Sequence, residues 1–167
     1  HLVCDQSRNE MIVNSVKQSV NNDRSVMVLT ERKEHIELLA KLMADKGIKV
    51  VELHGGISTK ERQERITFLS SKPSNDEAVV VLATGKYVGE GFDLPHLDTL
   101  FITLPIAWKG ILAQYAGRIQ REWSSKTIIQ VYDFIDDFPT LQRMWKKREK
   151  GYKALGYKVN EQKNLDF

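Results

Sequence analysis

The run Ala78-Val79-Val80-Val81-Leu82-Ala83 decides the fold class, because its consecutive apolar residues leave no polar face. A strand of this kind is buried on both sides, as in a parallel sheet covered by helices. Comparable strands are predicted at residues 25–29, 48–53, 97–104 and 127–135. Segments with the apolar spacing of helices separate them. The alternation predicts a three-layer α/β fold, with a parallel sheet and helices on both faces.

Helix start and end signals agree with this alternation. Ile12, Val16 and Val20 form one apolar stripe. Ser58 with Glu61 three residues later is a capping-box pattern. Gly47 stands in the usual place just past a helix end. The predicted helices cover residues 8–20, 31–46, 58–71, 111–121 and 138–155.

Small and polar residues directly follow three of the predicted strands. In open parallel sheets, ligands bind beyond the carboxyl ends of the strands. We therefore expect candidate contacts along one edge of the sheet, from Thr30, His54, Gly55, Gly56 and Thr84. The alternative is that Thr30 caps a helix and that the two glycines only turn the chain. Both roles can hold together.

The segment Gln114-Tyr115-Ala116-Gly117-Arg118-Ile119-Gln120-Arg121 places several polar groups on one side of a helix. Positions three, four and seven apart share a face, so Gln114, Arg118 and Arg121 point the same way. Gly117 on this stripe allows another surface to approach closely. Two guanidiniums and an amide suit a polyphosphate. A solvated basic face is the alternative.

Bulk properties indicate one compact domain without a membrane partner. The chain has 167 residues, a net charge of +3 and a pI near 8.9, which permits a polyanionic partner without requiring one. The single cysteine, Cys4, excludes an internal disulfide framework and favours a reducing, cytoplasmic location. No apolar run has the length of a membrane span. Because the chain begins at His1 without a preceding Met, we expect a piece of a longer protein.

Several chemistries are not supported by the residue pattern. The histidines His35, His54 and His96 are too scattered for a metal site, and His35 is expected on a helix surface. A phosphate-binding loop that contains Gly85 and Lys86 would need glycine at position 80 and Ser or Thr at position 87, and these positions are Val80 and Tyr87. A dinucleotide fingerprint fails because Leu94 replaces its third glycine.

The last 30 residues, 138–167, are predicted to form a separate C-terminal element after a domain of residues 1–137. Leu141, Trp145, Tyr152 and Leu155 form an apolar stripe. Its other side is strongly basic, and the favoured interpretation is a docking helix with a solvated outer face. The alternative is a basic patch along a nucleic-acid path. The basic residues are Arg143, Lys146, Lys147, Arg148, Lys150 and Lys153, against the single acidic Glu149.

Four segments together resemble superfamily 2 helicases. Residues 114–121 are similar to motif VI, with the pattern Gln-x-x-Gly-Arg-x-x-Arg. Residues 83–93, ending Gly-Glu-Gly-Phe-Asp, resemble motif V. Residues 26–30 resemble motif IV, and residues 49–56 resemble the segment that follows it. The order and spacing match a C-terminal RecA-like lobe, and residues 104–110 look like the restriction-subunit-type DEAD/DEAH group.

The resemblance implies half of an ATP-driven motor. Arg121 is the candidate arginine finger, Arg118 a second γ-phosphate contact, and Gln114 an orienting group. Cofactor contacts are expected from motif V at Glu90, Gly91 and Asp93, although Asp93 before Pro95 also suits a capping or turn role. The family's N-terminal RecA-like lobe holds the phosphates and the Mg²⁺ of ATP. The isolated chain is therefore expected to be inactive.

The resemblance also implies that nucleic acid crosses the top of both lobes. Gln114 opening motif VI favours DNA over RNA. One alternative is a catalytically idle binding or regulatory lobe, but the presence of both Arg118 and Arg121 argues against it. Another is an enzyme that uses a nucleotide cofactor, which is disfavoured because the dinucleotide fingerprint lacks its third glycine. The predicted backbone contacts are Thr30, Arg32, His54, Gly55, Gly56, Thr84 and Lys86.

Overall fold

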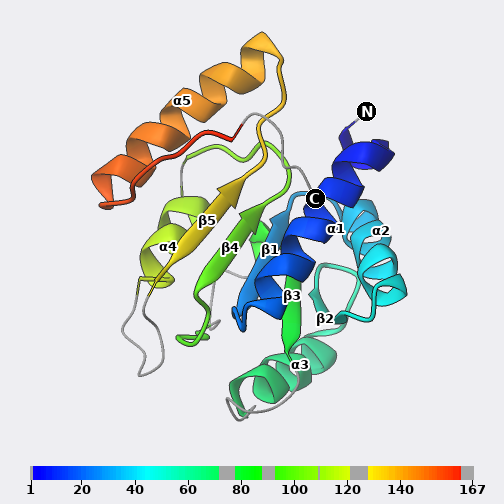
Figure 1. Ribbon diagram of the computed structural model, residues 1–167. Helices are drawn as coiled ribbons and strands as arrows, with labels where there is room; N and C mark the ends of the chain where they lie inside the picture. Colours follow the sequence, from blue (N-terminus) through cyan, green and yellow to red (C-terminus); the bar gives the residue numbers. More distant parts are fainter. Residues whose placement is uncertain (1, 72–77, 88–92, 109, 121–127, 163–167) are drawn as a thin grey trace.

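The computed structural model describes residues 2–71, 78–87, 93–108, 110–120 and 128–162. Within these ranges five strands form one sheet in the order β2-β3-β1-β4-β5, and every neighbouring pair is parallel (Figure 1). The predicted parallel α/β architecture is confirmed. The strands are β1 (Val26–Thr30), β2 (Lys49–Leu53), β3 (Val79–Thr84), β4 (Thr99–Ile102) and β5 (Gln130–Asp133).

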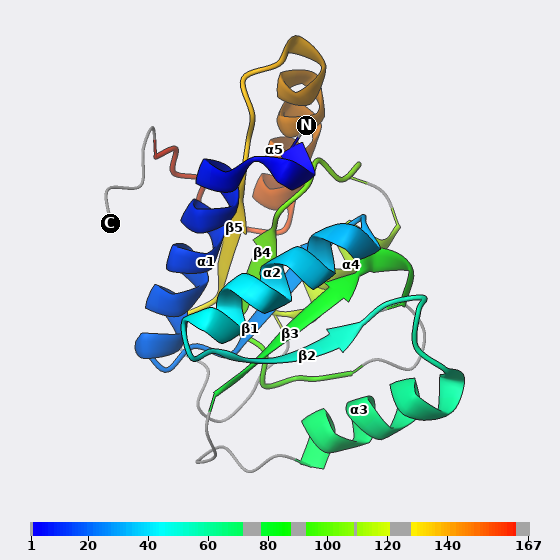
Figure 2. The same cartoon turned by 90° about the vertical axis from the view of Figure 1, so that its right-hand side faces the viewer.

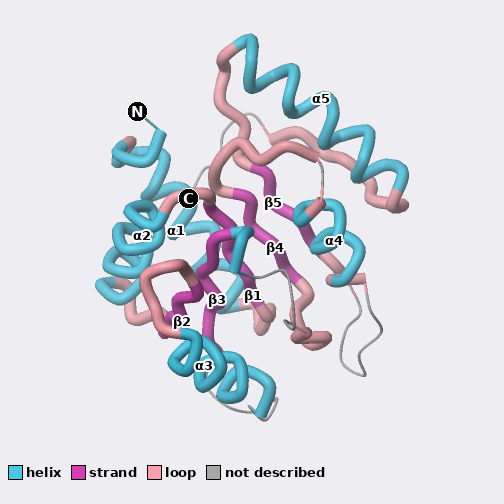
Figure 3. The backbone as a smooth tube through the Cα atoms, turned by 180° about the vertical axis from the view of Figure 1, so that it is seen from behind, coloured by secondary structure: helices cyan, strands magenta, loops and turns pink. Residues whose placement is uncertain are grey.

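The helices cover both faces of the sheet. Helices α1 and α2 pack on one face, where Ile12, Ile36 and Phe101 belong to one buried cluster (Figure 2). Helices α3 and α4 lie on the other face, which buries Ile66 and Leu112 (Figure 3). The helices are α1 (Gln6–Asn21), α2 (Lys33–Asp45), α3 (Thr59–Ser71), α4 (Ile111–Arg118) and α5 (Pro139–Ala154), with short 3-10 turns at Leu2–Cys4 and Gly85–Tyr87.

The central strands explain why the apolar runs identify the fold. All five residues of β1 are buried, and so are the last five of β3. Two edge-side elements are shorter than the sequence predicts. Strand β4 begins only at Thr99, because the Leu97 N–H turns back to the Leu94 carbonyl at 3.1 Å. Strand β5 is confined to Gln130–Asp133 among the described residues.

Helix α5 lies beyond the carboxyl ends of β4 and β5 (Figure 1). Its inner side packs Trp145 and Tyr152 against Ala116 of α4, as a docking helix should. One prediction about this helix is wrong. Arg148 is not on the exposed basic face but is 1% exposed, because its guanidinium is paired with Asp133 at the end of β5.

Candidate functional site

The carboxyl edge of the sheet brings together the residues predicted to contact nucleic acid. Thr30 and Thr84 end neighbouring parallel strands and are direct register partners. Leu53 pairs with Ala83, so His54 follows at the same edge. The sequence prediction that these residues share one rim is therefore confirmed in its geometry. Their contact with nucleic acid stays a prediction.

Thr30 is fully buried and belongs to an internal hydrogen-bond chain. Its Oγ1 lies 2.9 Å from Nδ1 of His35, and Nε2 of His35 lies 2.9 Å from Oδ1 of Asn9. The Asn9 amide nitrogen donates to the Val3 carbonyl at 2.8 Å, which leaves its oxygen as the acceptor. His35 therefore carries its proton on Nε2 and accepts the Thr30 hydroxyl proton at Nδ1.

This chain of hydrogen bonds contradicts two expectations from the sequence. His35 is not a surface residue but is 0% exposed. Burial, together with the nearby positive charge of Arg8, lowers its pKa to about 4, so the ring is neutral near pH 7. The Thr30 hydroxyl does not cap α2 either, since the N-cap residue is Arg32 and makes no side-chain cap bond. The Thr30 side chain instead links the end of β1 to α1 and α2.

His54 braces the turn that follows β2. Its Nδ1 accepts the backbone N–H of Gly56 at 2.9 Å. A β-carbon at Gly56 would lie 2.9 Å from Cε1 of His54 and 2.9 Å from Cε of Lys33, so a side chain there would force the His54 ring and the flexible end of Lys33 to shift. Residues 55 and 56 form a turn, so the turn-forming role considered for the two glycines is present.

The groups at this edge differ in accessibility. Thr84 is 8% exposed, and its hydroxyl is buried with no hydrogen-bond partner among the described residues. Arg32, Gly55, Gly56 and Lys86 are exposed. These four positions are accessible to a phosphate at this edge, whereas both threonine side chains are buried.

Helix α4 has one buried side and one side that faces outward. Leu112, Tyr115, Ala116 and Ile119 are buried against the sheet and α5. Gln114 is exposed, and Arg118 is the last residue of the helix. Asp93 is exposed at the start of the segment before β4. Arg121, Glu90 and Gly91 lie outside the described residues.

At Gly117 of α4, no described atom beyond its chain neighbours and the helix backbone lies within 4 Å of a β-carbon built there. This agrees with a surface that another body could approach. Gly110, with φ of 58°, adopts a left-handed backbone just before the helix begins. Such a φ favours glycine and sets the angle at which α4 leaves the preceding loop.

Two buried arginines hold the loop that leads into α4, and sequence reasoning missed both. Nη1 of Arg8 donates to the Thr103 carbonyl at 2.6 Å, and Nη1 of Arg148 donates to the Ile106 carbonyl at 3.1 Å. Each guanidinium also pairs with a carboxylate at or after the end of β5, Asp136 and Asp133 respectively. The available signal was position: Arg148 lies three residues from Trp145 and four from Tyr152, on the apolar stripe.

Further bonds tie α4 to the chain after α5. The Tyr157 hydroxyl donates to the Ala116 carbonyl at 2.7 Å, and burial raises the pKa of Tyr157 to about 12. The Gln120 amide donates to the Leu155 carbonyl at 2.8 Å.

In the part of the chain that the structure describes, no three His, Cys, Asp or Glu side chains gather at metal-binding distance, and no helix has the length and apolarity to cross a membrane.

Comparison of the sequence with known proteins identifies the family. Residues 7–123 match the model of the helicase conserved C-terminal domain. The chain belongs to this family. A curated relative, "Putative helicase 161L" of Invertebrate iridescent virus 6, is 30% identical over 158 residues, which covers 91% of this chain. The chain spans only 34% of the length of that relative.

Solved structures show the same fold for this helicase C-terminal domain. The crystal structure of T4 UvsW aligns with a TM-score of 0.70 over 89% of this chain and 32% of that chain, at 21% identity. Domain 2 of the DEAD-box helicase Mss116p, solved bound to an RNA duplex, aligns with a TM-score of 0.59 over 82% of this chain and 53% of that chain, at 20% identity. The resemblance to a RecA-like helicase lobe is confirmed.

Proposed function

We propose that this chain is the second motor lobe of an ATP-dependent nucleic-acid helicase or translocase. The observation that carries the proposal is the position of residues 114–118, the first part of motif VI, on α4. Leu112, Tyr115 and Ala116 on the apolar side of α4 are buried in the core, while Gln114 is exposed and a β-carbon at Gly117 would meet no described atom within 4 Å. The polar stripe of this helix therefore has room to meet a second lobe.

In this proposal the chain supplies charge to a nucleotide that another lobe holds. Splitting a γ-phosphate depends on positioning and on stabilising charge in the transition state. Arg121 acts as the arginine finger, Arg118 contacts the γ-phosphate, and Gln114 orients groups at the cleft. Glu90, Gly91 and Asp93 approach the nucleotide from motif V. The N-terminal lobe holds ATP and Mg²⁺, which supplies further positive charge at the phosphates.

Nucleic acid follows the carboxyl edge of the sheet. Exposed backbone at Gly55 and Gly56 and the charges of Arg32 and Lys86 suit phosphate oxygens, which fix position without reading sequence. The buried Thr30 and Thr84 support this edge, and His54 sets the turn. We favour DNA because glutamine opens motif VI.

The test is Arg121→Ala in the full-length parent protein. Removing an arginine finger lowers kcat by on the order of 10³–10⁵, so nucleic-acid-stimulated ATPase activity should nearly disappear. Arg121→Lys should not restore it, because a point charge lacks the planar fork. Thermal melts and nucleic-acid binding without nucleotide should be unchanged for both variants.

Two outcomes would contradict the proposal. Near-normal turnover of a well-folded Arg121→Ala protein would make residues 114–121 a solvated basic face. A parent protein without a phosphate-binding loop, or without ATPase activity, would instead support an idle binding lobe. The isolated chain should release phosphate only at the buffer background, with or without nucleic acid.

A further inference from the structure

The net positive charge of this protein comes from α5 and the four residues that follow it. Residues 139–158 hold seven basic side chains and one acidic side chain, a net charge of +6, whereas the whole chain carries +3. The remainder of the chain is therefore net negative, at −3. Separation of charge on this scale produces a strong local potential even in a protein of modest net charge.

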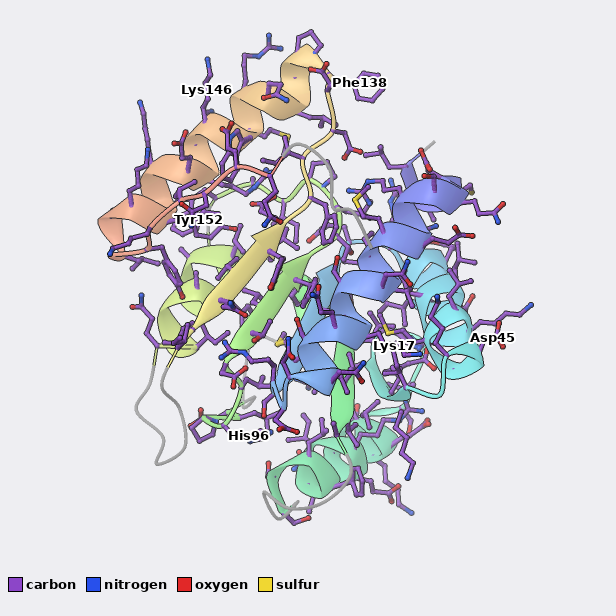
Figure 4. The ribbon with its side chains drawn as sticks, viewed as in Figure 1. Lys17, Asp45, His96, Phe138, Lys146 and Tyr152 are labelled. Carbon is purple, nitrogen blue, oxygen red and sulfur yellow. The ribbon has the colours of Figure 1, made fainter. Side chains whose placement is uncertain are left out.

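The basic residues of α5 form a continuous outward stripe. Helical spacing places Arg143, Lys146, Lys147, Lys150 and Lys153 on one side, and all five are exposed. Figure 4 shows Lys146 pointing away from the body of the protein and Tyr152 pointing into it. The stripe runs along roughly 15 Å of helix axis, at 1.5 Å per residue.

Few of these charges are neutralised within the protein. Lys153 pairs with Glu149 at 2.6 Å, and Arg143 donates to the Thr140 hydroxyl at 3.1 Å. Lys146, Lys147 and Lys150 form no ion pair with any described residue. Like charges at such spacing repel one another, and a polyanion would relieve that repulsion.

The stripe lies at the carboxyl edge of the sheet, where the contacts with nucleic acid are proposed. Arg148 on the inner side of α5 is bonded to Asp133, the last residue of β5, and to the carbonyl of Ile106 in the loop after β4. Because all five strands are parallel, this is the edge that also carries the ends of β1, β2 and β3. The basic helix therefore extends the row of predicted backbone contacts beyond β5.

We infer that the outer stripe of α5 binds the phosphodiester backbone of nucleic acid and lengthens the track across this lobe. The inference rests on the proposed function. A membrane surface fits less well, because an interfacial helix inserts its apolar face into lipid and the apolar face of α5 is occupied by Ala116 and the core around Trp108. Contacts of this kind are independent of sequence and weaken with salt.

The test uses the 167-residue chain and a fluorescent single-stranded oligonucleotide, prepared as DNA and as RNA. The variant is Lys146→Glu/Lys150→Glu. The matched control is Lys17→Glu/Lys41→Glu, which makes the same charge change at exposed positions of α1 and α2 away from this edge. Anisotropy titrations are made between about 50 and 200 mM salt. Thermal melts should be unaffected in both, since exposed substitutions change stability little.

We expect the α5 variant to bind on the order of tenfold more weakly at the lowest salt. The negative slope of log K against log salt should become shallower by about 1.4, since each of the two lost contacts with a single strand contributes about 0.7. The control should keep most of its affinity and its slope. Equal losses with DNA and RNA identify the shared backbone as the ligand, and a loss confined to one of them assigns the track to that polymer.

Other outcomes overturn the inference. It fails if the α5 variant binds like the wild type while Arg32→Ala/Lys86→Ala loses binding; the proposed nucleic-acid function then still stands. It also fails if the control loses as much as the α5 variant, which would reflect net charge alone. Absence of binding by the wild type would contradict the nucleic-acid function as well. Binding that depends on α5 for vesicles containing phosphatidylserine, but not for the oligonucleotide, would make α5 a lipid-surface element.

Discussion

Arg148 of α5 and Asp133 of β5 form a buried bidentate ion pair. Nε of Arg148 lies 2.7 Å from Oδ2 of Asp133, and Nη2 lies 2.9 Å from Oδ1. The Tyr152 hydroxyl donates to the same carboxylate at 3.0 Å, and burial raises the pKa of Tyr152 far above its ordinary value. The pair fixes α5 against the end of the sheet and, through the Ile106 carbonyl, against the loop that leads to α4.

Arg148→Met tests how much this pair contributes. Among the described residues, the change leaves the buried Asp133 with the Tyr152 hydroxyl as its one side-chain donor. Removal of one partner of a buried pair typically costs about 3–5 kcal/mol. The free energy of unfolding, measured by urea denaturation, should fall by that amount. Arg143→Met, on the exposed side of the same helix, is the control and should change it by less than about 0.5 kcal/mol. Equal stability of the two variants would show that the pair holds nothing in place.

Two helical glycines should respond to alanine with opposite signs. At Gly151 a β-carbon would overlap the indole of Trp108, which also packs edge-on against Tyr152 with ring centroids 4.9 Å apart. Overpacking costs about 1–3 kcal/mol, more than the roughly 1 kcal/mol that alanine adds in a helix. Gly151→Ala should therefore destabilise the domain and shift its tryptophan fluorescence.

Gly117→Ala is the matched change, because a β-carbon at that position would meet no described atom within 4 Å beyond its chain neighbours and the helix backbone. It should raise the free energy of unfolding by up to about 1 kcal/mol. A stabilising effect at Gly151, or a destabilising one at Gly117, would contradict the packing described for these helices. In the full-length parent, the same Gly117→Ala change should impair ATPase activity if a second lobe approaches α4 closely at this point.

Local signals in the sequence were sufficient for the architecture. The apolar run at residues 78–83 predicted a strand with both faces buried, and β3 has this burial. The capping-box pattern was also informative, since the Glu61 N–H donates to the Ser58 hydroxyl at 3.1 Å. Gly47 has φ of 74° just after α2, as its place in the sequence predicted. Each of these features depends on residues close together in the chain.

The features that sequence did not predict are long-range pairings of polar residues. His35 can be buried because Oδ1 of Asn9, 26 residues earlier, accepts a hydrogen bond from its Nε2–H. Arg148 is buried because Asp133 neutralises it from another element. A local pattern classifies both residues by their polar neighbours and places them on the surface. Only the three-dimensional structure shows that each residue has a hydrogen-bonding or charged partner from a distant part of the sequence.

The final prediction concerns acid stability and His35. Because burial lowers its pKa to about 4 from an ordinary value of 6.5, the unfolded chain takes up a proton as the pH falls below 6.5 while the native chain does not. The free energy of unfolding should therefore decrease as the pH falls from about 6.5 to about 4. At 1.36 kcal/mol per unit, this one group accounts for a decrease on the order of 3 kcal/mol.

His35→Gln isolates this contribution, because glutamine can still donate to Oδ1 of Asn9 but does not titrate. At pH 7 the variant should be less stable than the wild type by about 1–2 kcal/mol, through the altered contact with Thr30. As the pH falls towards 4, the difference should shrink and then reverse, since the wild type alone loses the stability that His35 provides in its neutral form. Both proteins share every carboxylate, so the comparison cancels the ordinary acid effects. Urea denaturation at several pH values between these limits measures the difference, and parallel curves for the two proteins would mean that His35 is protonated as easily in the native state as in the unfolded chain.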